Sequence, residues 1–250
     1  PKPPAVLEAV QHALQHESAN PGRGSHRMAV GASRTLLRTR QLLAQLLDVR
    51  NPVDIAFTTN TTVALNMAIF GYVRPGDHVI ATMTEHNSVW RPLEALKRSA
   101  DVQVTYVSVD SAGSLNLDEV ERAFTARTRL LICNHSSNLL GSILPVRELS
   151  ELAHRHDARI LLDIAQSAGH IPVQLESWKI DMAAFPGHKG LLGPQGTGGL
   201  YITPDLDLTP WLYGGTGSQS EEANQPSVRP DRYEPGTPNT PGIAGLAAGV

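Results

Sequence analysis

The spacing of the hydrophobic residues changes near residue 54. Before that point, apolar residues recur every three or four positions in two stretches, which is typical of amphipathic helices. The apolar positions are Val6, Val10, Ala13 and Leu14 in the first stretch and Leu36, Leu43 and Leu47 in the second. The turn-forming segment 20–24, Asn-Pro-Gly-Arg-Gly, separates the two predicted helices.

After residue 54, short apolar runs alternate with longer amphipathic segments. We expect strands at 54–58, 78–82, 102–109, 129–134, 159–163, 181–185 and 198–202, and helices at 61–71, 88–99, 116–125 and 146–156. Short apolar strands separated by helices are typical of βαβ units. The chain is therefore predicted to be an α/β protein with a mostly parallel seven-stranded sheet sandwiched by helices. Residues 203–242, rich in Pro, Gly and Ser, are expected to be irregular.

Composition excludes several classes of protein. The 250 residues have a net charge of −3, and Lys and Arg form no basic stripe, so we expect no nucleic-acid partner. No apolar run reaches the ~18 residues of a membrane span, and the first residues do not resemble a secretory signal. The single cysteine, Cys133, cannot form an internal disulfide, which agrees with a reducing, cytoplasmic location.

An acid and a lysine follow two of the predicted strands. Asp163 ends the apolar run 160–162, and Lys189 comes just after the run 182–185. Ligands of parallel sheets bind beyond the carboxyl ends of the strands. A pyridine aldehyde cofactor needs a lysine to form a Schiff base and a carboxylate to keep its ring nitrogen protonated. This pair therefore predicts a pyridoxal-phosphate enzyme.

Each of these residues also has an ordinary explanation. Asp163 alone could cap the next helix equally well, although Gln166, able to donate to a phenolic oxygen, favours the cofactor. Lys189 could be a surface lysine, but it lies between Gly187-His188 and a glycine-rich segment with little other charge. That segment is neither a phosphate loop nor a dinucleotide fingerprint, because the lysine precedes the glycines and a strand follows them.

Other polar segments follow the remaining strands. Thr61 and Thr62 begin a predicted helix, where backbone amides and hydroxyls could bind a phosphate or simply be capped. His86 could stack on a pyridine ring and move protons, or be an ordinary loop histidine. Asn138 could bind the cofactor or a substrate carboxylate, or lie in an ordinary turn. No two histidines cluster with a carboxylate at ligand spacing, so no metal site is expected.

Six motifs occur in a specific order. They are Phe57–Thr62 (FTTNTT), Glu85–Ser88 (EHNS), His135–Gly141 (HSSNLLG), Asp163–Gln166 (DIAQ), Gly187–Lys189 (GHK) and Glu234–Asn239 (EPGTPN). With this set the chain resembles the class V aminotransferase superfamily of pyridoxal-phosphate enzymes, fold type I. Within that superfamily it resembles the cysteine desulfurase and selenocysteine lyase branch, along nearly its whole length.

The resemblance implies a role for each candidate residue. Lys189 would form the Schiff base, Asp163 would pair with the ring nitrogen, and Gln166 with the ring hydroxyl. His86 would be the stacking base. The residues implied to hold the phosphate are Thr61, Thr62 and His188, with Thr237 reaching the phosphate of the neighbouring subunit.

The resemblance also implies a homodimer with active sites at its interface, in which Asn138 and Arg23 face the substrate. Residues 1–19 would form an N-terminal helical segment and residues 20–250 the cofactor-binding large domain. The smaller C-terminal domain of the family, which carries the sulfur-accepting loop cysteine, is expected to be largely missing. Pro186 stands where relatives usually carry Ser or Thr, so one phosphate hydroxyl would be absent.

The implied reaction is release of sulfur from L-cysteine, giving L-alanine and an enzyme persulfide that a sulfur-acceptor protein could receive. Lys189 and Asp163 would serve equally in an aminotransferase, a selenocysteine lyase or an epimerase. The chain could also be a truncated, inactive dimeric scaffold. Cys133, at the end of a predicted strand, is expected to be a small core residue and not the persulfide carrier.

Overall fold

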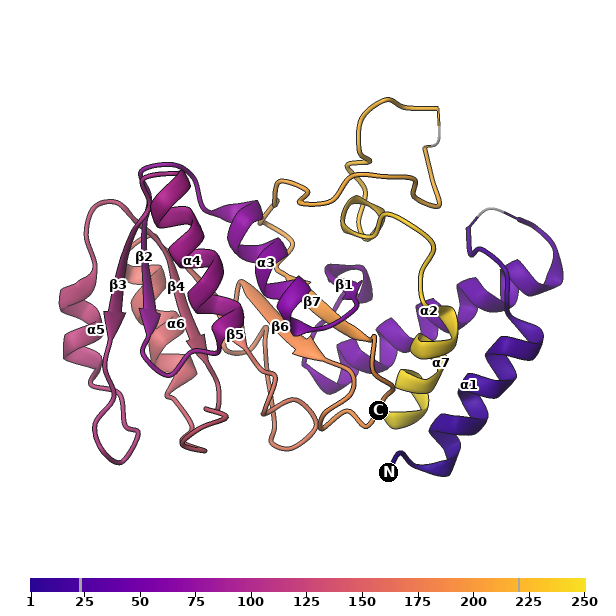
Figure 1. Ribbon diagram of the computed structural model, residues 1–250, viewed down its shortest axis with the longest axis horizontal. Helices are drawn as coiled ribbons and strands as arrows, with labels where there is room; N and C mark the ends of the chain where they lie inside the picture. Colours follow the sequence, from indigo (N-terminus) through magenta and orange to yellow (C-terminus); the bar gives the residue numbers. More distant parts are fainter. Residues whose placement is uncertain (23, 220) are drawn as a thin grey trace.

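The protein is built around one mixed β-sheet (Figure 1). The computed structural model describes residues 1–22, 24–219 and 221–250. In the described residues the sheet has seven strands in the order β1-β7-β6-β5-β4-β2-β3. The strands are β1 (Ile55–Thr58), β2 (His78–Thr82), β3 (Gln103–Val107), β4 (Thr128–Asn134), β5 (Arg159–Asp163), β6 (Met182–Pro186) and β7 (Gly198–Ile202). The predicted strands and the α/β class are confirmed.

The strands from β6 to β3 pair in parallel, whereas β7 runs antiparallel to both of its neighbours, β6 and β1. The reason lies in the connection between β6 and β7. Parallel neighbours need a crossover, usually a helix, but antiparallel neighbours can be joined by a loop. Residues 187–197 form such a loop and contain no helix. This loop carries Lys189.

Helices cover both faces of the sheet (Figure 1). They are α1 (Pro4–His16), α2 (Arg27–Leu46), α3 (Thr61–Tyr72), α4 (Asn87–Ser99), α5 (Leu117–Ala123), α6 (Val146–Arg155) and α7 (Thr240–Gly249). Residues of α2, α5 and α6 belong to the core on one face, and residues of α3 and α4 to the core on the other. None of the helices in the described ranges is long and apolar enough to pass through a bilayer.

The alternation of side chains along a strand supplies both cores. In β5, Ile160 and Leu162 belong to one core and Leu161 to the other, and all three are fully buried. Successive side chains of a strand point to opposite faces, so a strand covered on both sides must be apolar throughout. Asp163 is the first polar residue of β5 after this run, and it lies where the strand leaves the core.

Helix α7 was not predicted from the sequence. Residues 203–242 are largely irregular, as expected, apart from a short 3-10 turn (Asp231–Tyr233) and the start of α7. Glycines within α7 weaken its intrinsic helix propensity. They also permit close packing, because a Cβ on Gly245 would lie 2.7 Å from Cγ2 of Val10 in α1. Tertiary packing against α1 and α2, together with a cap from Asn239 to the amide of Gly242, stabilises this helix.

An ion pair connects the irregular C-terminal segment to the sheet. The guanidinium of Arg40 in α2 binds both carboxylate oxygens of Glu234, at 2.6 and 2.5 Å. Arg40 also donates to the carbonyl of Ile55, and Glu234 accepts from the amide of Phe57. The two side chains are only 6% and 14% exposed. The pair therefore holds Glu234 against the first strand.

We expect Arg40→Met to destabilise the protein by about 3–5 kcal/mol, because it leaves the carboxylate of Glu234 buried without its cation. Urea unfolding followed by circular dichroism measures this change. Arg147→Met, which removes an exposed pair with Glu151, is the control and should cost less than about 1 kcal/mol. Equal losses in the two variants would contradict the prediction.

Candidate active site

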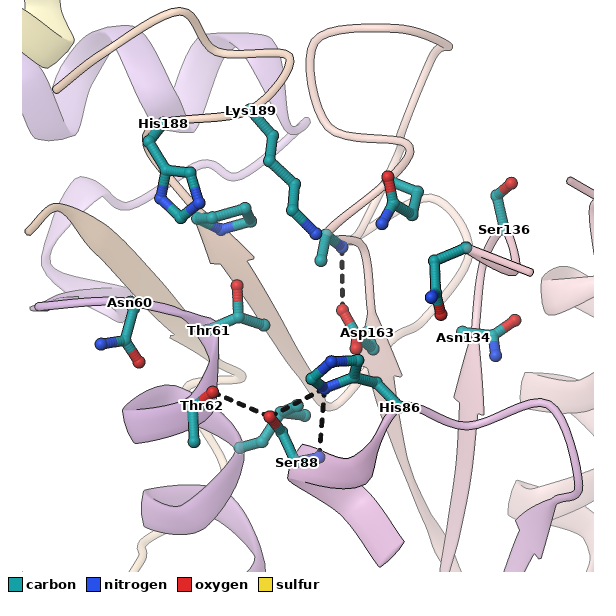
Figure 2. A pocket seen from close by; sticks show the side chains of 15 residues that line it. Asn60, Thr61, Thr62, His86, Ser88, Asn134, Ser136, Asp163, His188 and Lys189 are labelled. Carbon is teal, nitrogen blue, oxygen red and sulfur yellow. Dashed lines mark hydrogen bonds between the residues drawn. The ribbon is translucent and has the colours of Figure 1, made fainter. Parts of the chain in front are cut away.

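Most of the candidate residues line one cavity at the carboxyl ends of the central strands (Figure 2). The cavity, of about 180 Å³, lies beside the N-termini of α3 and α4 and the ends of β4, β5 and β6. The predicted residues that line it are Thr61, Thr62, His86, Asn138, Asp163, Gln166, His188 and Lys189. Residues from five of the six motifs thus converge on one space.

Two predicted residues are not part of this group. Thr237 lines two other cavities, of about 630 and 240 Å³, next to Glu234. Arg23 lies outside the residues that the structure describes. Where side-chain placement is described, no group of three or more His, Cys, Asp or Glu residues is arranged to hold a metal ion.

Asp163 is the last residue of β5 and is 5% exposed. One of its carboxylate oxygens accepts a 2.8 Å hydrogen bond from the amide of Ala165. Burial raises the pKa of Asp163, and the Ala165 amide and the charges of Lys189 and His86 oppose that rise. A buried acid at the wall of a cavity is best stabilised by a cation. A protonated ring nitrogen fits this position.

Lys189 lies in the loop between β6 and β7, and its side chain extends into the cavity toward Asp163 (Figure 2). The loop is held by 2.8 Å backbone hydrogen bonds from Gly187 to Thr197 and from Gly193 to Gly187. Gly187 is required here, because a Cβ would lie 2.1 Å from Oγ1 of Thr197. The backbone before the lysine is therefore closely packed, and it presents the amine from a defined position.

His86 is the N-cap residue of α4, and its ring has a defined tautomer. Nδ1 accepts a 3.1 Å hydrogen bond from the amide of Ser88. A backbone amide can only donate, so Nδ1 carries no proton and Nε2 is the protonated nitrogen of the neutral ring. The Ser88 hydroxyl lies 2.9 Å from Nδ1 and 2.8 Å from the hydroxyl of Thr62. Ser88 therefore links His86 to the start of α3, a role that the sequence did not indicate.

The start of α3 has the features of an anion site. The side-chain oxygen of Asn60 accepts a 3.0 Å hydrogen bond from the amide of Val63, so Asn60 is the N-cap of this helix. By helix geometry, the amides of Thr61 and Thr62 have no acceptor within the helix. They remain available at the positive end of the helix dipole, beside the cavity. Capping and anion binding are thus compatible here.

Two further polar atoms at the cavity are buried and have no hydrogen-bond partner among the described residues: Nδ1 of His188 and Oδ1 of Asn134. Buried polar atoms are normally paired, so their presence indicates a polar ligand. Together with the Asp163 acid and the α3 amides, they fit a phosphorylated pyridine. Asn134 lies opposite Asp163 in the register of β4 and β5 and lines the cavity. It is therefore a site residue that the sequence did not indicate.

Pro186 ends β6 and lines the cavity, so it contributes no hydroxyl or amide there. Cys133 is fully buried within β4, as expected for a core residue. Burial raises the pKa of its thiol well above the usual value. A buried, protonated thiol is a poor nucleophile, so Cys133 is not suited to accept sulfur.

Comparisons with known proteins show the family of this chain. The family model for class V aminotransferases matches residues 1–250. A probable cysteine desulfurase of Methanothermobacter thermautotrophicus is 37% identical over all of this chain, which covers 63% of that relative. A cysteine desulfurase of Synechococcus elongatus is 32% identical, again over the whole chain and 41% of the relative. The chain thus spans less than two thirds of the length of these curated relatives.

Solved structures give the same result. The apo cysteine desulfurase of Thermococcus onnurineus matches with a TM-score of 0.92 and 34% identity, over 99% of this chain and 63% of that one. The cysteine desulfurase CsdA of Escherichia coli matches with a TM-score of 0.88 and 30% identity, over 99% and 64%. With a family model that matches its full length and relatives more than 30% identical over the whole of it, this chain belongs to the class V aminotransferase family.

Proposed function

We propose that this protein is a pyridoxal-phosphate enzyme that releases sulfur from L-cysteine and leaves L-alanine. The observation that carries the proposal is the convergence of Lys189 and Asp163 on one cavity. The similarity to proteins named cysteine desulfurase supports the choice of substrate. When bound, the cofactor supplies an electron sink for the carbanion formed at the substrate α-carbon.

The residues of the chain bind and orient the reacting groups. Lys189 would hold the cofactor through its Nζ, and the same Nζ, when free, would accept the α-proton of the substrate. Asp163 keeps the ring nitrogen protonated, and Gln166 donates to the ring hydroxyl. His86, with Nδ1 fixed by Ser88, lines the same cavity and would be the stacking base. Thr61, Thr62 and His188 hold the phosphate, and Asn138 faces the substrate.

The assembly and the sulfur acceptor are part of the same proposal. We infer a homodimer in which Thr237, outside the cavity of its own subunit, contacts the phosphate in the neighbouring one. Because Cys133 is buried, a thiol outside these residues takes the sulfur and passes it to an acceptor protein. One solved relative was determined in complex with cysteine, at 28% identity and a TM-score of 0.87.

Incubation of the protein with pyridoxal phosphate, L-cysteine and a thiol reductant tests the activity. We expect sulfide and alanine to appear in equal amounts. Alanine without sulfide would instead indicate transamination. A faster reaction with L-selenocysteine would indicate a selenocysteine lyase. A protein that binds the cofactor but turns over neither substrate would contradict the proposal.

A further inference from the structure

Glu85 is a buried carboxyl group that the chemistry proposed above does not use. It lies between β2 and α4, directly before His86, and is 6% exposed. Acidic residues are rarely buried to this degree unless a cation pairs with them. The contacts of its two oxygens show how this burial is tolerated.

One oxygen of Glu85 joins two strand ends. Oε1 accepts a 2.5 Å hydrogen bond from the hydroxyl of Thr82, the last residue of β2. It also accepts a 2.8 Å bond from the amide of Asn134, the last residue of β4. Asn134 is the partner of Asp163 in the β4–β5 ladder. Glu85 thus connects the turn that carries His86 to the strand that positions Asp163.

The other oxygen has no such role. Oε2 of Glu85 is buried without a hydrogen-bond partner, and in the described part of the chain no cation forms an ion pair with this carboxyl group. A buried carboxylate in this situation would pay a large desolvation cost, which protonation removes. Burial raises the pKa of Glu85 to about 8, against the hydrogen bond from Thr82, and the negative charge of Asp163 adds to the rise.

The titratable groups around Glu85 and Asp163 favour different protonation states for these two carboxyl groups. Asp163 on β5 and the thiol of Cys133 on β4 interact electrostatically with Glu85, and neither supplies a positive charge. Lys189 and His86 act on Asp163 and stabilise its anion. When two acids share a site, their surroundings decide which one keeps the charge. Here the cation of Lys189 favours charge on Asp163 and a proton on Glu85.

We propose that Glu85 is a positioning residue that works as a neutral carboxylic acid, fastening the turn before His86 to the end of β4. In this form it fixes His86 and Asp163 without adding a second negative charge next to Asp163. The functional part of this inference rests on the proposed function. The protonation state is a property of the apo protein and can be measured separately.

Thermal unfolding of the apo protein as a function of pH tests the protonation state. The folded protein keeps the Glu85 proton up to about pH 8, whereas the unfolded chain releases it near 4.5. The folded state therefore binds more protons between these values, and its stability falls as the pH rises through this window. Glu85→Gln removes this dependence. We expect the melting temperature of Glu85→Gln minus that of the wild type to increase by roughly 10 °C between about pH 5 and about pH 9.

Glu119→Gln, at an exposed position in α5, is the matched control, and its difference from the wild type should stay constant with pH. A constant difference for Glu85→Gln as well would overturn the proposal, because it would mean that folded Glu85 titrates as an ordinary glutamate. This outcome is decided without any cofactor, so it is independent of the proposed activity.

Cofactor titration tests the positioning role. We expect Glu85→Gln to keep the cofactor dissociation constant within about threefold of the wild type, because the amide oxygen still accepts from Thr82 and Asn134. Glu85→Ala, which loses both hydrogen bonds, should weaken binding by about tenfold or more. Equal losses in the two variants would overturn the role of a neutral acid. If Glu85→Ala does not fold, the pH series of Glu85→Gln decides alone.

Discussion

Replacing Lys189 with alanine is expected to abolish the covalent attachment of the cofactor and to lower turnover by about 10³-fold or more. The reason is that one amine holds the cofactor and moves the α-proton. Lys189 lies in the β6–β7 loop opposite Asp163. Among the described residues, no other lysine lines the cavity and could replace it. The measurement is the visible absorbance band that the cofactor gains when it binds the protein, followed before and after borohydride reduction.

Lys97→Ala is the control for this experiment, because Lys97 is exposed on α4 and pairs with Glu94 at the surface. It should keep both the band and its reduction by borohydride. A wild-type protein that shows no band after incubation with the cofactor would favour the alternative of an inactive scaffold. A normal band in Lys189→Ala would place the attachment at another lysine.

Asp163→Asn is expected to lower turnover by about 10²–10⁴-fold and to weaken cofactor binding, while the fold persists. The amide has nearly the same shape and can still accept from Ala165, but it has no charge to hold the ring nitrogen protonated. The loss of turnover should therefore exceed the loss of binding. Steady-state kinetics with L-cysteine and a cofactor titration separate the two quantities.

The raised pKa of Asp163 predicts that cofactor binding depends on pH. Burial raises the pKa of Asp163, so as the pH falls this side chain takes up a proton earlier than an exposed aspartate. Cofactor binding should weaken correspondingly on the acid side in the wild type, and less so in Asp163→Asn. Asp118→Asn, at an exposed position in α5, should leave binding and its pH dependence unchanged. Identical acid-side profiles in wild type and Asp163→Asn would assign the titration to another group.

The central residues of the site could be predicted from the sequence because each one ends a recognisable apolar run. Asp163 follows Ile160–Leu162, and Lys189 follows β6 after a short turn. In a parallel sheet, the carboxyl ends of the strands share one edge, so residues at those ends meet whatever the details of packing. Burial of Cys133 was predictable for the same reason, since it lies within such a run.

The polar contacts around these residues could not be predicted in the same way. Ser88 fixes the tautomer of His86, Asn134 lies beside Asp163, and Glu85 joins β2 to β4. Ser88 and Glu85 occur in a motif already noted and Asn134 directly precedes another, but their partners are determined by which strand lies next to which. That order is not a local property of the chain. A hydrogen bond across some 50 positions leaves no periodic signal in the sequence.

The sequence by itself determined the elements of this protein and the chemistry at their ends, because periodicity and burial act over a few neighbouring residues. Tertiary structure decided what depends on distant contacts. It set the antiparallel direction of β7, since the loop after β6 is too short for a helical crossover. It stabilised α7, whose glycines weaken the local signal but allow close packing on α1. It also left Glu85 buried without a cation, which no spacing of residues could have indicated.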